Sequence, residues 1–181
     1  RGPIVGPVVA AAVILPKNYQ LDGLTDSKKI SEKKRKIYYD IILRDAVSVG
    51  IGVVSAEVID KINILEASRL AMMKAIENLS VKPEHILSDA MKLEVGIPVT
   101  PIIKGDLLSI SISAASVVAK VTRDEMMIEL DKTYPMYEFS HHKGYPTKRH
   151  LELIHKYGIL DNYRMSFKPV KEVLESGINE K

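Results

Sequence analysis

The chain contains no cysteine. Disulfide bridges and thiolate metal ligands are therefore excluded, and the composition fits a reducing compartment such as the cytoplasm. The sequence also has no uninterrupted run of about 18 apolar residues, so no membrane span is expected. Its longest apolar stretch, residues 8–15, has only the length of a strand, and no cleavage pattern follows it, so no signal peptide is expected.

Positive and negative charges are nearly balanced, because the chain has 26 Lys and Arg residues and 23 Asp and Glu residues, which gives a net charge of +3. This balance permits binding to a polyanion but does not establish it. Basic residues gather around positions 28–36 and 143–156, where they form either solvated helix faces or polyanion-binding surfaces. With 181 residues and no linker, repeat or low-complexity segment, the chain is predicted to form a single domain over residues 1–181.

Strands and helices are predicted to alternate along the chain. Four strands are predicted from apolar runs and from alternation, at residues 8–15, 47–53, 85–88 and 102–103. Pro98 and Pro101 are predicted to lie in the loop before the last strand. Helices are predicted after Ser31, from Ser55 to about residue 79, over residues 113–134, from Thr147 through Tyr157, and after Lys168. This order indicates an α/β layered fold.

Two acids are predicted to follow short strands. Asp89 ends the segment of residues 85–88, and Asp106 follows residues 102–103. Acids placed in this way lie at a sheet edge, where ligand sites form, and carboxylates suit the divalent ions that hydrolyse phosphodiesters. The alternative is turn chemistry, because Asp commonly caps turns at strand ends. Two carboxylates are also too few for a two-ion site, so the residues alone leave both interpretations open.

Five blocks carry the most specific patterns of the sequence. They are RGPIVGPVVAAAV at residues 1–13, TDSKKIS at 25–31, KGD at 104–106 with SAASVVAKVTRD at 113–124, HKGYPTKRH at 142–150, and RMSF at 164–167. In this order, from residue 1 to residue 170, they resemble the blocks of the ribonuclease HII family. A chance match of five ordered blocks is very improbable, so the resemblance is specific.

The resemblance implies a ribonuclease H-like fold, in which helices flank a mixed central sheet and a helical C-terminal part follows. It also implies hydrolysis of RNA in RNA/DNA hybrids and at single ribonucleotides embedded in duplex DNA. Two Mg²⁺ or Mn²⁺ ions would be required, and a protein nucleophile would not. Cleavage on the 5′ side of the ribonucleotide would leave 3′-hydroxyl and 5′-phosphate ends. We expect a cytoplasmic monomer without a membrane partner, acting in DNA repair and replication.

The same resemblance implies roles for single residues. Asp89 and Asp106 correspond to two metal-binding acids of the family. Arg1 and Gly2 correspond to the end of a loop that contacts the 2′-hydroxyl, and Tyr145 to a ring that stacks on the neighbouring sugar. Taken alone, Tyr145 could instead be a half-buried ring in a turn. Phosphate contacts are implied for residues that could otherwise serve helix packing or solvation: Ser113, Ser116, Lys120, Lys28 and Lys143.

The sequence also departs from the family pattern. The family's first two metal ligands, an Asp and a Glu before Ala-Gly, have no counterpart in residues 1–181, and neither has the first half of its opening hairpin. Ala90 stands where the family usually has Gly. Residues 1–181 alone are therefore expected to bind the ions weakly and to cleave poorly. Two alternatives stay open: a module that binds hybrids without cutting, and a DNA nuclease of the same fold, such as a resolvase or transposase domain.

Overall fold

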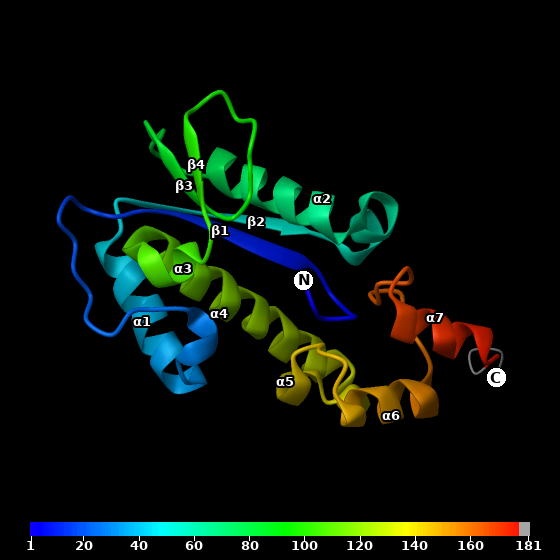
Figure 1. Cartoon of the computed structure of the whole chain (residues 1–181). Coiled ribbons are helices and arrows are strands. Elements are labelled where there is room, and N and C mark those ends of the chain that lie inside the picture. The colour runs from blue at the N-terminus through cyan, green and yellow to red at the C-terminus, as the bar shows by residue number, and fades with distance from the viewer. Residues whose placement is uncertain (178–181) are drawn as a thin grey trace. The chain divides into compact units, whose positions relative to one another are not determined.

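The computed structural model describes residues 1–177 and divides them into two compact units (Figure 1). One unit comprises residues 1–8, 54–68 and the chain from residue 123, and the other comprises residues 9–53 and 69–122. The elements are β1 (Val8–Ile14), η1 (Ser27–Lys29), α1 (Glu32–Asp45), β2 (Ser48–Val54), α2 (Ala56–Glu77), β3 (Ile86–Asp89), β4 (Val99–Ile102), α3 (Gly105–Leu108), α4 (Ile110–Thr133), η2 (Pro135–Tyr137), α5 (Phe139–His142), α6 (Lys148–Tyr157) and α7 (Lys168–Glu175). The predicted alternation of strands and helices is confirmed.

In the unit of residues 9–53 and 69–122, strand β2 separates two helical layers. Successive strand residues point to opposite faces. On one face, Val49 and Ile51 pack against the core that α1 and α4 build. On the other, Gly50 and Gly52 face α2, whose Ala71 carbonyl oxygen would lie 1.9 Å from a Cβ at Gly52. Figure 1 shows α2 on one side of β2 and α1 and α4 on the other. The alternation that predicts this strand therefore places packing side chains toward α1 and α4 and glycines toward the backbone of α2.

The strands of this unit form two separate pairs, β1 with β2 and β3 with β4, where the family resemblance implies one mixed central sheet. The β3–β4 pair is parallel, and Ser88 lies opposite Pro101. Pro101 therefore stands inside β4 and not in the predicted loop. Proline has no N–H to donate to a ladder, and it is tolerated here because β4 is an edge strand with one strand neighbour.

The segment after β4 also differs from the prediction. Asp106 is expected directly after a strand, but it lies in the first turn of the short helix α3. Lys104 causes the change, because it takes a left-handed conformation with φ of 55° and turns the chain into a helix that begins at Gly105. Ala90, after β3, has the same φ of 55°. This conformation favours glycine, the residue that the family resemblance leads us to expect at that position.

The predicted helix ends are largely confirmed. The Ser31 hydroxyl accepts a hydrogen bond from the Lys34 amide, and the Thr147 hydroxyl accepts one from the His150 amide. Helix α4 begins at residue 110, three residues before the predicted start, and α2 is interrupted at Asn63, where φ is 69°. None of the helices within residues 1–177 combines the length and the apolarity needed to cross a bilayer.

The other unit has an aromatic core. Tyr137 and Phe139 stack with ring centroids 5.4 Å apart, and the rings of His142 and His150 stack at 3.8 Å. His150 is fully buried; its Nδ1 lies 2.8 Å from the Tyr145 carbonyl oxygen, and its Nε2 lies 2.8 Å from the Tyr163 hydroxyl. A carbonyl only accepts, so Nδ1 carries the proton and Nε2 accepts from the tyrosine. The fold therefore holds His150 neutral.

This arrangement predicts loss of stability in acid. Burial lowers the pKa of His150 from 6.5 to about 4, and burial also lowers the pKa of His142. Between pH 4 and pH 6.5 the unfolded chain protonates His150 and the folded chain does not, so the unfolded chain binds more protons. The stabilisation is therefore complete above pH 6.5 and is lost as the pH falls toward 4. We expect the free energy of unfolding to be about 2 kcal/mol lower at pH 5 than at pH 7.

Denaturant unfolding at several pH values measures this effect. His150→Asn should weaken the pH dependence, whereas the matched change His155→Gln, at an exposed position of α6, should leave it intact. An unchanged pH dependence in His150→Asn would contradict the assignment.

Candidate metal and nucleic-acid site

Three carboxylates gather in the unit of residues 9–53 and 69–122. Asp89 ends β3, and its Oδ1 accepts a hydrogen bond of 3.1 Å from the Gly105 amide, at the start of the helix that carries Asp106. Burial raises the pKa of Asp106, and the charges of Asp26 and Asp89 raise it further. A side-chain hydrogen bond with Asp26 acts in the same direction. The two predicted acids are thus brought together, and a third one joins them.

Asp26 is not among the acids that the sequence predicts for this site. It precedes η1, where its Oδ1 accepts a 2.9 Å hydrogen bond from the Lys28 amide. Its position within the block of residues 25–31 is a signal that could have pointed to it, but a Thr-Asp-Ser run has the composition of an ordinary turn. Only the folded chain shows that this loop reaches Asp106.

The chemistry of these side chains fits a divalent cation. Carboxylate oxygens are the ligands that Mg²⁺ and Mn²⁺ prefer. Burial and, after it, repulsion between carboxylates raise the pKa of Asp106, and a cation would relieve that repulsion. The set is incomplete, because no group of three or more His, Asp or Glu side chains within residues 1–177 is arranged to hold a metal ion. By their chemistry, the described acids therefore match only part of the ligand set that such a site requires.

Three of the four phosphate-contact candidates of this unit interact with the acids or with a residue next to them. Lys28 is exposed, and its charge lowers the pKa of Asp106, so it lies within electrostatic reach of that carboxyl. Ser113 is buried and donates to the backbone carbonyl of Asp106 at 2.6 Å. Ser116 donates to the Ser27 hydroxyl at 2.8 Å. Lys120 is half-buried on α4. The two serines thus also tie α4 to the segments that carry Asp106 and Asp26.

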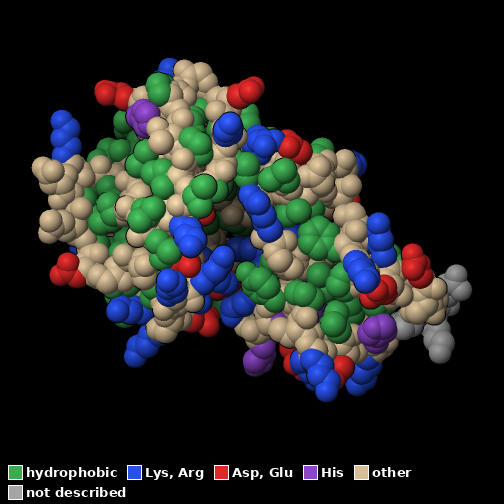
Figure 2. All heavy atoms as spheres, viewed as in Figure 1, with side chains coloured by type: hydrophobic (Ala, Val, Ile, Leu, Met, Phe, Trp, Pro, Cys, Tyr) green, Lys and Arg blue, Asp and Glu red, His purple; other side chains and the backbone are tan. Residues whose placement is uncertain are grey.

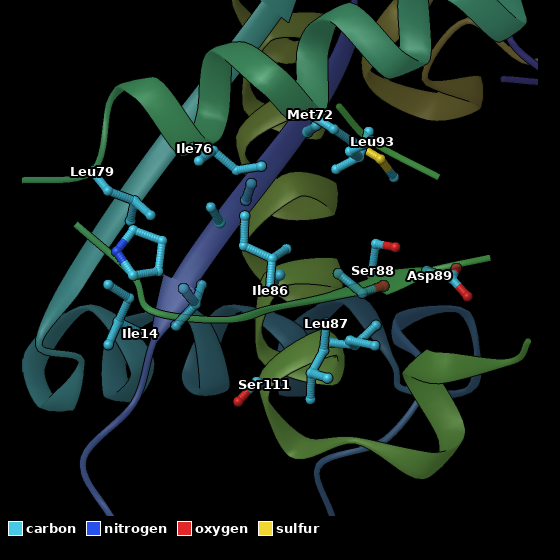
Figure 3. Close-up of a pocket in the computed structure, with 18 of the residues that line it drawn as sticks. Ile14, Met72, Ile76, Leu79, Ile86, Leu87, Ser88, Asp89, Leu93 and Ser111 are labelled. Atoms are coloured by element: carbon cyan, nitrogen blue, oxygen red, sulfur yellow. The ribbon is translucent and has the colours of Figure 1, made fainter. Parts of the chain in front are cut away.

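A cavity of about 540 Å³ lies beside β1 and β3 (Figure 3). Every residue from 9 to 15 and every residue from 85 to 89 lines it. Because neighbouring strand residues point to opposite faces, a cavity that touches all of them runs along the strand edges. The rest of its lining comes from α2, α4 and nearby loops, and includes Met72, Ile76, Leu79, Leu93, Ser111, Ile112, Ala115 and Ser116. Asp89 stands where the β3 edge ends.

The other candidates lie in the unit that includes residues 1–8 and the chain from residue 123. A Cβ at Gly2 would lie 3.3 Å from Cε1 of Tyr145, so the Arg1–Gly2 backbone runs directly beside that ring. Tyr145 is 39% exposed, which leaves part of the ring accessible. Lys143 has a left-handed backbone with φ of 53°, and its Nζ donates to the Ser140 carbonyl. Arg1, Gly2 and Tyr145 therefore form one contiguous surface.

Basic side chains are interspersed with acidic ones on the face that Figure 2 shows. Several are tied by ion pairs, such as Arg149 with Glu138 at 2.5 Å and Lys61 with Glu57 at 2.6 Å. The basic stretch around residues 143–156 is thus partly neutralised in place.

Comparisons with known proteins agree with the fold and the blocks. The sequence profile named Ribonuclease HII matches residues 1–170. A ribonuclease HII from Bacillus cytotoxicus is 56% identical over 176 residues, which cover 97% of this chain and 68% of the relative. The structure of ribonuclease H2 from Pyrococcus horikoshii OT3 superposes with a TM-score of 0.80 at 24% identity and covers 100% of this chain and 95% of that one. That of Bst-RNase HIII in complex with Mn²⁺ superposes with a TM-score of 0.71 at 16% identity, over 99% of this chain and 68% of that one.

The structural likeness shows a ribonuclease H-like α/β fold. The sequence likeness also shows the family, because the profile spans most of the chain and the relative is identical at more than half of the aligned residues. The chain belongs to the ribonuclease HII family.

Proposed function

We propose that this chain forms the metal-binding and hybrid-binding body of an endoribonuclease. The enzyme hydrolyses RNA in RNA/DNA hybrids and at single ribonucleotides embedded in duplex DNA, leaving 3′-hydroxyl and 5′-phosphate ends. The observation that carries the proposal is the gathering of Asp26, Asp89 and Asp106 in a chain of the ribonuclease HII family. Residues 1–181 would act as one catalytic domain. A monomeric state, a cytoplasmic location and roles in DNA repair and replication stay predictions.

In this proposal Asp89 and Asp106 would help to hold two Mg²⁺ or Mn²⁺ ions, and Asp26 would assist them. The bound ions would supply activation of the attacking water and stabilisation of the leaving oxygen. The Gly105 amide orients Asp89 through Oδ1, and the Ser113 hydroxyl holds the backbone of Asp106. Both contacts fix ligands before an ion arrives, which reduces the reorganisation that binding requires. The Mn²⁺ complex of Bst-RNase HIII, a protein of the same fold, supports this choice of ion.

The remaining ligands would come from residues that precede Arg1 in the full-length protein. The family pattern places an Asp-Glu pair just before this Arg-Gly-Pro block. An extended segment fits the cavity between the edges of β1 and β3, because both edges line it and helices lie on either face. The curated relative is longer than this chain, which spans 68% of it. A strand in that position would join the two strand pairs and bring its acids toward Asp89.

Ribonucleotide recognition is assigned to the surface of Arg1, Gly2 and Tyr145. Backbone groups at Gly2 would contact the 2′-hydroxyl, and the Tyr145 ring would stack on the adjoining sugar. Phosphate contacts would come from Lys28, Lys120 and Lys143, with Ser113 and Ser116 contributing through the helix that they anchor.

The test is cleavage of a duplex that contains one ribonucleotide by the full-length protein. We expect a single cut on the 5′ side of the ribonucleotide in Mg²⁺ or Mn²⁺, and a loss of roughly 10³-fold or more when EDTA removes the ion. End-labelled gels identify the termini, and an all-DNA duplex and a uniform RNA/DNA hybrid serve as controls. Equal cutting of the all-DNA duplex would favour the DNA nuclease, and undiminished cleavage in EDTA would exclude the metal mechanism.

A second candidate function concerns residues 1–181 without any preceding segment. The described residues form no complete metal cage, which favours a module that binds hybrids and cuts them poorly. Adding the upstream segment discriminates the two, since restored cleavage supports the enzyme and unchanged binding without cleavage supports the module.

A further inference from the structure

Two buried arginines organise the backbone beside Tyr145. Arg164 is fully buried and Arg123 is 9% exposed. Burial lowers the pKa of Arg164 to about 10 and also lowers the pKa of Arg123, yet a group with a pKa of 10 stays charged at neutral pH. Burying a cation is costly unless its donors are satisfied. The hydrogen-bond partners of these guanidinium groups therefore show which part of the chain they hold in place.

The partners of Arg164 are carbonyl oxygens of residues 1–7. Its Nη1 donates to the carbonyls of Arg1 at 3.1 Å and Pro3 at 2.8 Å. Its Nε donates to Gly6 at 3.0 Å, and its Nη2 donates to Pro7 at 3.1 Å. One planar side chain therefore fixes four peptide groups of a single segment.

Arg123 joins the same segment to the turn that carries Tyr145. Its Nη2 donates to the Val5 carbonyl at 2.9 Å and its Nε to the Pro7 carbonyl at 3.1 Å. Its Nη1 donates to the Lys143 carbonyl at 2.6 Å, two residues before Tyr145. Arg123 stands in the middle of α4, yet its hydrogen bonds reach backbone groups that are distant in sequence.

The sequence of residues 1–7 explains why side chains must supply the hydrogen-bond donors for its carbonyl groups. Pro3 and Pro7 have no amide N–H, and the segment belongs to no regular strand before Val8. Buried carbonyls need donors, and the chain's own backbone offers few of them here. The amides of Ile4 and Gly6 are themselves bound, to the carbonyls of Gly144 and Asn162. The position of Gly2 against the Tyr145 ring is thus set by long-range contacts.

We propose that Arg164 and Arg123 are positioning residues for ribonucleotide recognition, which hold the Arg1–Gly2 backbone at a fixed distance from the Tyr145 ring. The inference rests on the proposed recognition surface. Neither arginine need touch the substrate. Reading a single hydroxyl demands donors and acceptors fixed within a fraction of an ångström, and small misplacement costs up to about 10²-fold in rate. Lysine keeps the charge but cannot reproduce the planar set of donors.

The experiment uses Arg164→Lys and Arg123→Lys in the full-length protein, with Arg44→Lys as the matched control. Arg44 is exposed and pairs with Asp45, so its variant should behave as the parent. Steady-state cleavage is measured on a duplex with one ribonucleotide and on the all-DNA duplex. We expect KM on the ribonucleotide substrate to rise on the order of tenfold or more and selectivity over DNA to fall. General instability would instead reduce the active fraction, and hence the apparent kcat, without moving KM.

Hydrogen exchange supplies a readout that is independent of activity. The amides of Ile4 and Gly6 should exchange faster in the lysine variants, while the Gly158 amide, bound to Ile154 in the same unit, keeps its protection. The inference would be overturned if the Ile4 and Gly6 amides kept their protection in the lysine variants. It would also be overturned if these amides exchanged faster while KM and selectivity stayed unchanged. Global unfolding of both variants would overturn it as well, since the arginines would then serve the fold as a whole.

The proposed recognition surface is tested separately with Tyr145→Ala, which removes the ring proposed to stack, and with Gly2→Ala. If these variants keep full selectivity, the surface is misassigned, whatever the arginines do. If they lose selectivity and the lysine variants keep it, only the positioning role fails.

Discussion

Replacing Asp89 by Asn in the full-length protein is expected to abolish cleavage while binding of an RNA/DNA hybrid survives. The amide oxygen of the introduced asparagine would still accept from the Gly105 amide, as Oδ1 of Asp89 does at 3.1 Å, so the link between β3 and α3 is kept. What is lost is the negative charge that a divalent ion requires. Metal ions contribute several kcal/mol to such reactions, so single-turnover cleavage should fall roughly 10³-fold or more.

Asp40→Asn is the matched control, because Asp40 is an exposed acid on α1 of the same unit. It should cleave as the parent does. Fluorescence anisotropy with a labelled hybrid checks that Asp89→Asn still binds. Near-normal turnover of Asp89→Asn would remove Asp89 from the metal site, and lost binding together with lost cleavage would point to a folding defect instead.

The second large effect is expected on stability, from Gly52→Ala. A Cβ at Gly52 would lie 1.9 Å from the carbonyl oxygen of Ala71 and 2.7 Å from the amide nitrogen of Ala75. Both atoms belong to the backbone of α2, so no side-chain rotation relieves the overlap, and the helix must move away from β2. We expect the free energy of unfolding to fall by about 3 kcal/mol or more, which corresponds to roughly 10 °C in Tm.

Gly96→Ala separates this steric effect from the backbone strain of a non-glycine residue in a left-handed conformation. Gly96 has φ of 69°, but no atom lies within 4 Å of the position of its Cβ. Its replacement should cost only about 1 kcal/mol, the usual penalty for a left-handed non-glycine residue. Denaturant unfolding of both variants gives the comparison. Equal, small losses in the two would show that α2 and β2 are less tightly packed than the distances indicate.

Local signals in the sequence predict local structure well. The hydroxyls of Ser31 and Thr147 cap the helices that they are predicted to start, because a cap needs only an acceptor within three residues of an unsatisfied amide. The alternation over residues 47–53 predicts β2, since strand periodicity is a property of consecutive residues. Where a long-range effect intervenes, prediction fails: Pro101 lies in β4 because that strand is at an edge, and an edge is a feature of the sheet.

The sequence by itself determined the family and the α/β alternation, and it singled out Asp89 and Asp106 as candidates, because ordered blocks and apolar patterns are properties of consecutive residues. Tertiary structure alone decided that Asp26 joins those acids and that Arg123 and Arg164 bind the backbone of residues 1–7. It also decided that β1 and β3 line one cavity with their edges. The physical reason is that carboxylate repulsion, guanidinium hydrogen bonds and strand edges depend on distances through space, which the spacing of residues along a chain does not encode.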